Sequence, residues 1–112
     1  MMNTEKNYAE GEILVVKKDI GGILFEWDEE KNELNMRKHG IRFELALRVF
    51  YDENRLEEYD ESHSEAEDRY ISLGYVNGVL VVVHTDRDEA IRIISARPAD
   101  KKERMKYYEQ FD

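Results

Sequence analysis

Residues 70–85 read YISLGYVNGVLVVVHT. Two runs of β-branched, aromatic and aliphatic residues flank Asn77-Gly78, a dipeptide that is strongly typical of β-hairpin turns. Every position of the run Val79–Val83 is apolar, which predicts a central strand covered on both faces. The stretch therefore predicts an antiparallel hairpin in the middle of a sheet.

Further strands are expected on both sides of this hairpin, because short β-prone runs alternate with turn residues. One is Ile91–Ala96 after the hairpin, and another is Leu56–Tyr59 before it, followed by the loop Asp60–Asp68. Near the N-terminus, Ile13–Val16 and Ile23–Trp27 are expected to be strands on either side of Gly21-Gly22.

Three helices are expected from capping signals and from apolar spacing. Asp28 is a suitable N-cap, and Gly40 can end the first helix in a left-handed conformation. Apolar residues at three- and four-residue spacing predict a second helix over Phe43–Tyr51. Pro98 interrupts the last strand, and Asp100 with Glu103 forms a capping box that opens a C-terminal helix.

This order of elements predicts an α+β fold. A small antiparallel meander would carry two helices from the N-terminal half and one C-terminal helix. The length of 112 residues suits one domain. We expect residues 1–22 to be an N-terminal extension with one added strand, its first dozen residues a loose or helical lead-in, and residues 23–112 to be the domain.

Composition excludes several classes of function. The chain has no cysteine, which excludes disulfides, thiolate metal sites and a cysteine nucleophile. Neither a membrane-spanning run nor a signal peptide is recognisable, so a cytoplasmic protein without a membrane partner is expected. The net charge is −9, of which −8 comes from residues 52–68, with nine acidic residues and one basic residue. The basic residues gather instead in 31–48 and 92–106.

The register of the meander predicts a candidate anion site. A two-residue turn at Asn77-Gly78 would place Ile71 opposite His84, and a loop over 86–90 would place His84 opposite Arg92. Because strand side chains alternate between faces, Arg69, His84 and Arg92 would then share one face, while Thr85 and Arg97 would point to the other.

A family resemblance is carried by ordered blocks of residues. In the first half they are Phe25-Glu26-Trp27-Asp28, Lys31, Asn32, Asn35, Arg37-Lys38-His39-Gly40-Ile41, Phe43-Glu44 and Ala46. In the second half they are Glu67-Asp68-Arg69-Tyr70, Gly74, Val82-Val83-His84-Thr85, Ile91-Arg92-Ile93-Ile94-Ser95-Ala96-Arg97, Lys102-Glu103-Arg104 and Tyr108-Glu109. The chain resembles the BrnT family of toxins over about residues 23–109.

The resemblance implies a RelE-like fold and a metal-independent endoribonuclease, without cofactors, that inhibits translation. It also implies a partner, a BrnA-like antitoxin that binds DNA. The chain departs from the family pattern at Arg42, where a capping Ser is frequent, at Pro98, where a Lys is usual, and in the extension 1–22.

Cleavage of RNA without a metal requires deprotonation of the 2′-hydroxyl, charge neutralisation at the phosphorus and protonation of the leaving oxygen. We expect Arg69, His84, Arg92 and Arg97 to be catalytic. The residues expected to bind RNA are Lys38, His39 and Arg104.

Each of these residues also has a plain structural reading. His84 could be a strand-end histidine bonded to neighbouring backbone, and His39 could stabilise a helix C-terminus. The arginines could form salt bridges with the acidic segment 52–68, and His63 is expected to be a solvated loop residue. The whole chain could instead be a non-catalytic module that binds RNA or a protein on the same fold, which its acidic charge favours.

Overall fold

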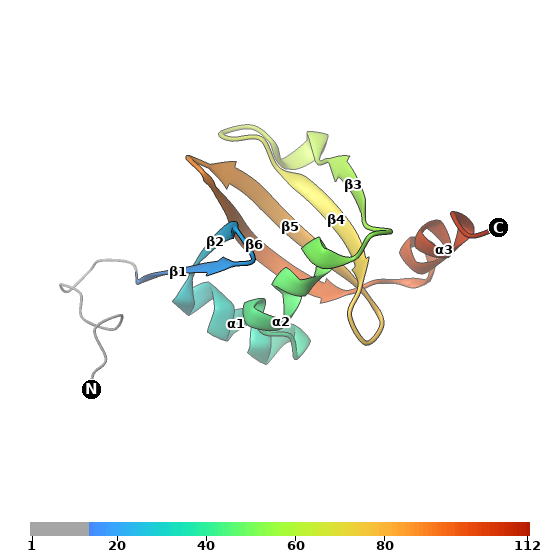
Figure 1. Ribbon diagram of the computed structural model, residues 1–112, viewed down its shortest axis with the longest axis horizontal. Coiled ribbons are helices and arrows are strands. Elements are labelled where there is room, and N and C mark those ends of the chain that lie inside the picture. Colours follow the sequence, from blue (N-terminus) through green and yellow to red (C-terminus); the bar gives the residue numbers. More distant parts are fainter. Residues whose placement is uncertain (1–13) are drawn as a thin grey trace.

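The computed structural model describes residues 14–112, so the lead-in expected over the first dozen residues lies outside the described part. A six-stranded sheet has the order β1-β2-β6-β5-β4-β3 (Figure 1). The strands are β1 Val15–Ile20, β2 Ile23–Asp28, β3 Leu56–Tyr59, β4 Tyr70–Tyr75, β5 Val79–Arg87 and β6 Ala90–Pro98. The helices are α1 Glu29–His39, α2 Phe43–Ala46 and α3 Lys101–Glu109, with 3-10 turns η2 Leu47–Tyr51 and η3 Glu61–His63.

The predicted α+β class is confirmed, with one addition to the meander. Adjacent strands are antiparallel except β2 and β6, which are parallel and paired at Phe25↔Ile91 and Glu26↔Arg92. This parallel pair lets β1 and β2 extend the meander at its β6 edge. The first strand begins at Val15 and ends at Ile20, later in the chain than the 13–16 expected from the sequence.

The two faces of the sheet are covered to different extents. On the first, Phe25, Val82 and Ile93 pack against Phe43 and Leu47 from the helical segments, and we call it the covered face. Figure 1 shows α1 and α2 lying together on this side. The second, which we call the open face, carries Glu26, Thr85, Arg92 and Arg97, and α3 packs on only one end of it through Tyr107, Leu73 and Val81.

Two buried asparagines fix the helices to the sheet. Asn35 on α1 donates to the Ala96 carbonyl and accepts from its N–H, at 2.8 and 3.1 Å. Asn35 thereby provides hydrogen-bond partners for the Ala96 backbone, in the part of β6 that β2 does not reach. Asn32 accepts from the Phe43 N–H at 2.7 Å, which caps α2 where Arg42 makes no side-chain cap. No helix within residues 14–112 is long and apolar enough to span a membrane.

Both hairpin registers differ from those expected. Tyr75 pairs with Val79, so three residues form the turn and His84 lies opposite Tyr70 rather than Ile71. In the next hairpin the turn contains only two residues, and Thr85 is the residue opposite Arg92, while His84 lies opposite Ile93. The prediction that His84 faces Arg92 is therefore wrong.

Candidate functional site

A β-bulge in β6 determines which arginines share a face. Thr85 pairs with Arg92 and Val83 pairs with Ser95, so the β6 segment between these pairs contains one extra residue, with the irregularity at Val83/His84. Strict alternation would place Arg92 and Arg97 on opposite faces, because five positions separate them. The extra residue reverses that parity, as bulges near functional sites often do. Both arginines therefore lie on the open face, and the expected separation of Arg97 from Arg92 is wrong.

Arg69 joins them from the loop that precedes β4. It lies one residue before Tyr70, which alternation places on the covered face with His84, so Arg69 belongs to the open face beside Thr85. Its N–H donates to Ser64 Oγ at 2.9 Å, and its carbonyl accepts from the Asp60 N–H at 2.8 Å. These bonds hold the backbone of Arg69 in place at the end of the loop.

Thr85 links the two sides of this group. Arg92 is its neighbour on β6, and its hydroxyl donates to the Asp68 carbonyl next to Arg69. Two strand spacings separate Arg92 from the position of Arg69, which is about 10 Å between Cα atoms. Thr85 itself is 1% exposed, so an anion would meet the outward ends of the Arg69 and Arg92 side chains rather than Thr85.

Two of the three arginines also have carboxylate partners. Arg92 donates to Glu26 at 2.7 Å, and the side chains of the pair are 16% and 8% exposed. Arg97 donates to both Glu103 oxygens on α3, at 2.8 and 2.7 Å. This bidentate bond holds the pKa of Glu103 below its usual range and raises that of Arg97. Neither carboxylate belongs to the segment 52–68 that was considered as the alternative partner.

The Arg69 side chain has no such partner within residues 14–112. It lines a small hollow with loop residues 62–67 and forms no ion pair with any described residue. Glu65 and Glu67 line the same hollow, and Glu67 pairs with Arg87 rather than with Arg69.

His84 lies on the covered face, which corrects its expected place beside the arginines. Its Nε2 is 2.8 Å from Ser72 Oγ, and its ring packs between Phe50 and Tyr70. Burial lowers the pKa of His84 to about 4, so the imidazole is neutral at physiological pH. Among the described residues, its Nδ1 is a buried polar atom without a hydrogen-bond partner.

The residues expected to bind RNA are not gathered with the arginines. Lys38 is exposed and His39 partly exposed at the end of α1, on the covered side of the sheet. Arg104 is on α3, where its guanidinium donates to the Ala99 carbonyl at 2.9 Å. His63 is a largely exposed loop residue beside Asp60, and residues 14–112 contain no group of three His, Asp or Glu side chains suited to a metal ion.

Glu26 and Thr85 are site residues that the sequence did not single out. Glu26 lies between Phe25 and Trp27, both fully buried on the covered face, so alternation alone could have placed it on the other face. Thr85 could be found only from the correct register of β5 against β6.

Comparison with known proteins defines the class. Residues 27–103 match the family described as "Ribonuclease toxin, BrnT, of type II toxin-antitoxin system", and the chain belongs to this family. No curated protein sequence matches the chain. A type II toxin–antitoxin family implies an antitoxin as partner.

A solved relative agrees with this assignment. The crystal structure of the Brucella abortus ribonuclease toxin BrnT is similar to this chain, with 25% sequence identity and a TM-score of 0.51. The similarity covers 67% of this chain and 94% of the Brucella protein. The fold and the ribonuclease toxin family expected from the sequence are both confirmed.

Proposed function

We propose that this chain is a metal-independent endoribonuclease that inhibits translation and that a BrnA-like, DNA-binding antitoxin neutralises it. One observation carries the proposal: the bulge in β6 puts Arg92 and Arg97 on the same open face that alternation in β4 gives to Arg69. Arginines bind phosphate oxygens through a fork of N–H donors and stay charged at any working pH. Because the proposed substrate is RNA that takes part in translation, we expect the protein to act in the cytoplasm.

In the proposed reaction the 2′-hydroxyl attacks the adjacent phosphorus. Its oxygen forms a new bond to phosphorus, the bond to the 5′ oxygen breaks, that oxygen takes a proton from water, and a 2′,3′-cyclic phosphate remains. Arg69 and Arg92 stabilise the negative charge that develops on the phosphoryl oxygens in the transition state. Arg97 lies further along β6, about 15 Å from Arg92 by strand rise, and holds a neighbouring phosphate.

The proton of the 2′-hydroxyl needs an acceptor on the same face. His84 is on the covered face, and we therefore leave it out of the proposed chemistry. Glu26 is the buried carboxylate next to Arg92, at 2.7 Å. We assign it the role of proton acceptor, with Arg92 orienting its carboxylate. A Glu26→Gln variant keeps an oxygen that accepts from Arg92 but cannot take a proton, so its kcat should fall while RNA binding persists.

The first experiment separates an enzyme from a binding module. Induction of the chain without its antitoxin should arrest growth, and the purified protein should cut RNA in the presence of a metal chelator. Single-stranded DNA of the same sequence should remain intact, because it lacks the attacking hydroxyl. Protein that binds RNA or the antitoxin but cuts no RNA, with or without ribosomes, would establish the non-catalytic reading instead.

The second experiment concerns the partner. The gene should lie beside one for a small DNA-binding antitoxin, and the two purified proteins should co-elute at micromolar concentration. In the complex the antitoxin should cover the open face. Amide hydrogen exchange of residues 90–98 should then be slower than in the free protein. Separate elution of the two proteins would contradict the proposed pairing.

A further inference from the structure

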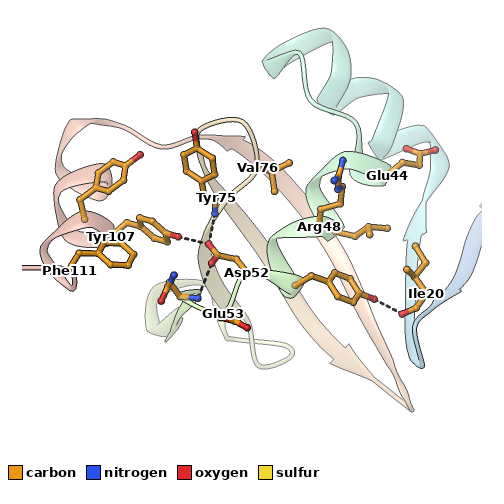
Figure 2. Close-up of a pocket in the computed structure, with 13 residues that line it drawn as sticks. Ile20, Glu44, Arg48, Asp52, Glu53, Tyr75, Val76, Tyr107 and Phe111 are labelled. Carbon is orange, nitrogen blue, oxygen red and sulfur yellow. Dashed lines mark hydrogen bonds between the residues drawn. The ribbon is translucent and has the colours of Figure 1, made fainter.

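A second surface feature lies apart from the arginines. A cavity of about 860 Å³ opens between η2, the turn after β4 and α3 (Figure 2). Its walls are mainly aromatic and aliphatic, from Ile20, Tyr51, Tyr75, Val76, Tyr108 and Phe111. We call it the aromatic groove.

The aromatic groove is held open by a polar centre. Figure 2 shows Asp52 accepting hydrogen bonds from the Tyr107 hydroxyl and from the Tyr75 N–H, the latter at 2.7 Å. Burial alone would raise the pKa of Asp52, but these hydrogen bonds and one from the Asn54 N–H lower it, so the carboxylate stays ionised at neutral pH. Tyr51 is fixed separately, because its hydroxyl donates to the Ile20 carbonyl. These bonds fix Tyr51, Tyr107 and the backbone of Tyr75 around the aromatic groove.

The aromatic groove leaves a large apolar surface in contact with water. Tyr75, Tyr108 and Phe111 are each about half exposed, and Ile20 and Tyr51 more than a third. Contiguous exposed apolar residues of this kind mark binding surfaces, whereas isolated ones are ordinary. Rigid tyrosines also lose little conformational entropy on binding, which suits them to anchor a partner.

Charge restricts the kind of partner. Among the described residues that line the aromatic groove, Glu44 and Glu53 are acidic beside Asp52, and Arg48 is the one cation. Asp52 also begins the segment 52–68, with nine acidic residues and one basic residue. An RNA phosphate chain would be repelled from such a rim. A second copy of the chain, with its own charge of −9, would also be repelled. The rim is complementary to a basic polypeptide.

We propose that the aromatic groove holds an amphipathic, basic segment of the antitoxin, whose apolar side chains enter between Tyr75, Tyr108 and Phe111. Lysines or arginines that flank this segment contact Glu44 and Glu53. The proposal rests on the antitoxin partnership proposed above and adds the place and chemistry of the contact. Since the groove is lined by none of the three arginines, this segment anchors the antitoxin while another part of it reaches the open face.

The test measures binding of the purified product of the neighbouring antitoxin gene to the full chain. Tyr75→Ser with Tyr108→Ser should weaken binding roughly 30-fold or more, as expected for removal of central aromatic anchors. Glu53→Lys should slow association roughly tenfold. Met105→Ser is the matched control, because Met105 is 61% exposed on the same helix but does not line the groove.

Ribonuclease activity gives an independent readout. The double tyrosine variant should cut RNA at the wild-type rate when free, and should need roughly 30-fold more antitoxin for inhibition. An unchanged thermal unfolding midpoint shows that the variant is folded. If the double variant unfolds, Phe111→Ser is measured in its place, and it should likewise cut RNA at the wild-type rate and need more antitoxin for inhibition.

Four results would overturn the proposal. Equal antitoxin affinity for wild type and the groove variants would remove the groove as the contact. An equal loss in Met105→Ser would show that the effect is not specific to the groove, and a dimer of the chain alone that Tyr108→Ser abolishes would assign the groove to a second copy. If the wild-type chain does not bind the antitoxin at all, the proposed partnership fails together with the groove.

Discussion

His84 on the covered face is 3% exposed and neutral, whereas Arg97 on the open face keeps 42% of its side chain exposed and is charged. Both residues come from adjacent strands of the same sheet, and both are of types that serve in RNA cleavage. The difference arises from what packs around each side chain, since Phe50 and Tyr70 enclose the His84 ring, while Arg97 lies at the border of α3 and bonds Glu103 there. A residue of a type suited to catalysis can therefore be assigned to the site only once we know which face of the sheet it occupies.

The largest expected change in stability comes from the ion pair on the open face. Arg92→Ala leaves the buried Glu26 carboxylate without its partner, which should lower the free energy of unfolding by about 3–5 kcal/mol in urea titrations. Replacing both Arg92 and Glu26 by Leu should lower the free energy of unfolding less, because no buried charge is then left unpaired. A loss below about 1 kcal/mol for Arg92→Ala would mean that solvent screens the pair as on an exposed surface.

The next effect concerns His84 and pH. Its folded pKa of about 4 is below the unfolded value of about 6.5, so the stability that neutral His84 contributes is complete above pH 6.5 and is lost as the pH falls toward 4. The shift corresponds to about 3 kcal/mol. The unfolding free energy of wild type should therefore fall about 3 kcal/mol more than that of His84→Gln between these pH values. Parallel curves for the two proteins would show that His84 is hydrated.

The smallest effect concerns how closely the covered face is packed. A Cβ added at Gly74 would lie 2.6 Å from Val49 Cγ1 and 3.1 Å from the Val49 carbonyl oxygen, so η2 would have to move. Gly74→Ala should destabilise the protein by about 1–3 kcal/mol, as overpacking of a core does. Combining it with Val49→Ala removes the Cγ1 contact, and this double variant should recover part of the loss. No loss in the single variant would contradict the close approach of η2 to β4.

Local signals in the sequence predicted both ends of α1 and the start of α3 correctly, whereas the single helix expected over Phe43–Tyr51 is the short α2 followed by the 3-10 turn η2. Asp28 caps α1, Gly40 ends it in a left-handed conformation with φ 74°, and Asp100 with Glu103 forms the capping box of α3. Each of these features depends on residues within one or two turns, so the sequence contains all the information needed. The β-prone runs likewise predicted β2 to β6 with errors of one or two residues at the ends, but of β1 only Val15 and Val16 were expected.

The register between strands could not be predicted in the same way. A three-residue turn in place of a two-residue turn moved His84 opposite Tyr70, and the bulge in β6 brought Arg97 to the face of Arg92. Both features depend on packing between distant segments, and a shift of one residue moves every later side chain to the other face. Arg69 and Arg92 remained on one face because each hairpin was shifted by one residue, which moved both arginines from the face of His84 to the face of Thr85.

The direct test of the account compares the two faces in one assay. Arg69→Ala and His84→Gln are measured beside wild type for cleavage of the same RNA in the presence of a metal chelator. Arg69 has no ion-pair partner within residues 14–112, so its loss should leave the fold intact and reduce kcat/KM roughly 100-fold. Folded His84→Gln should stay within about threefold of wild type, a difference below 1 kcal/mol in the barrier. A full-rate Arg69→Ala with an inactive but folded His84→Gln would place the chemistry on the covered face and contradict the account.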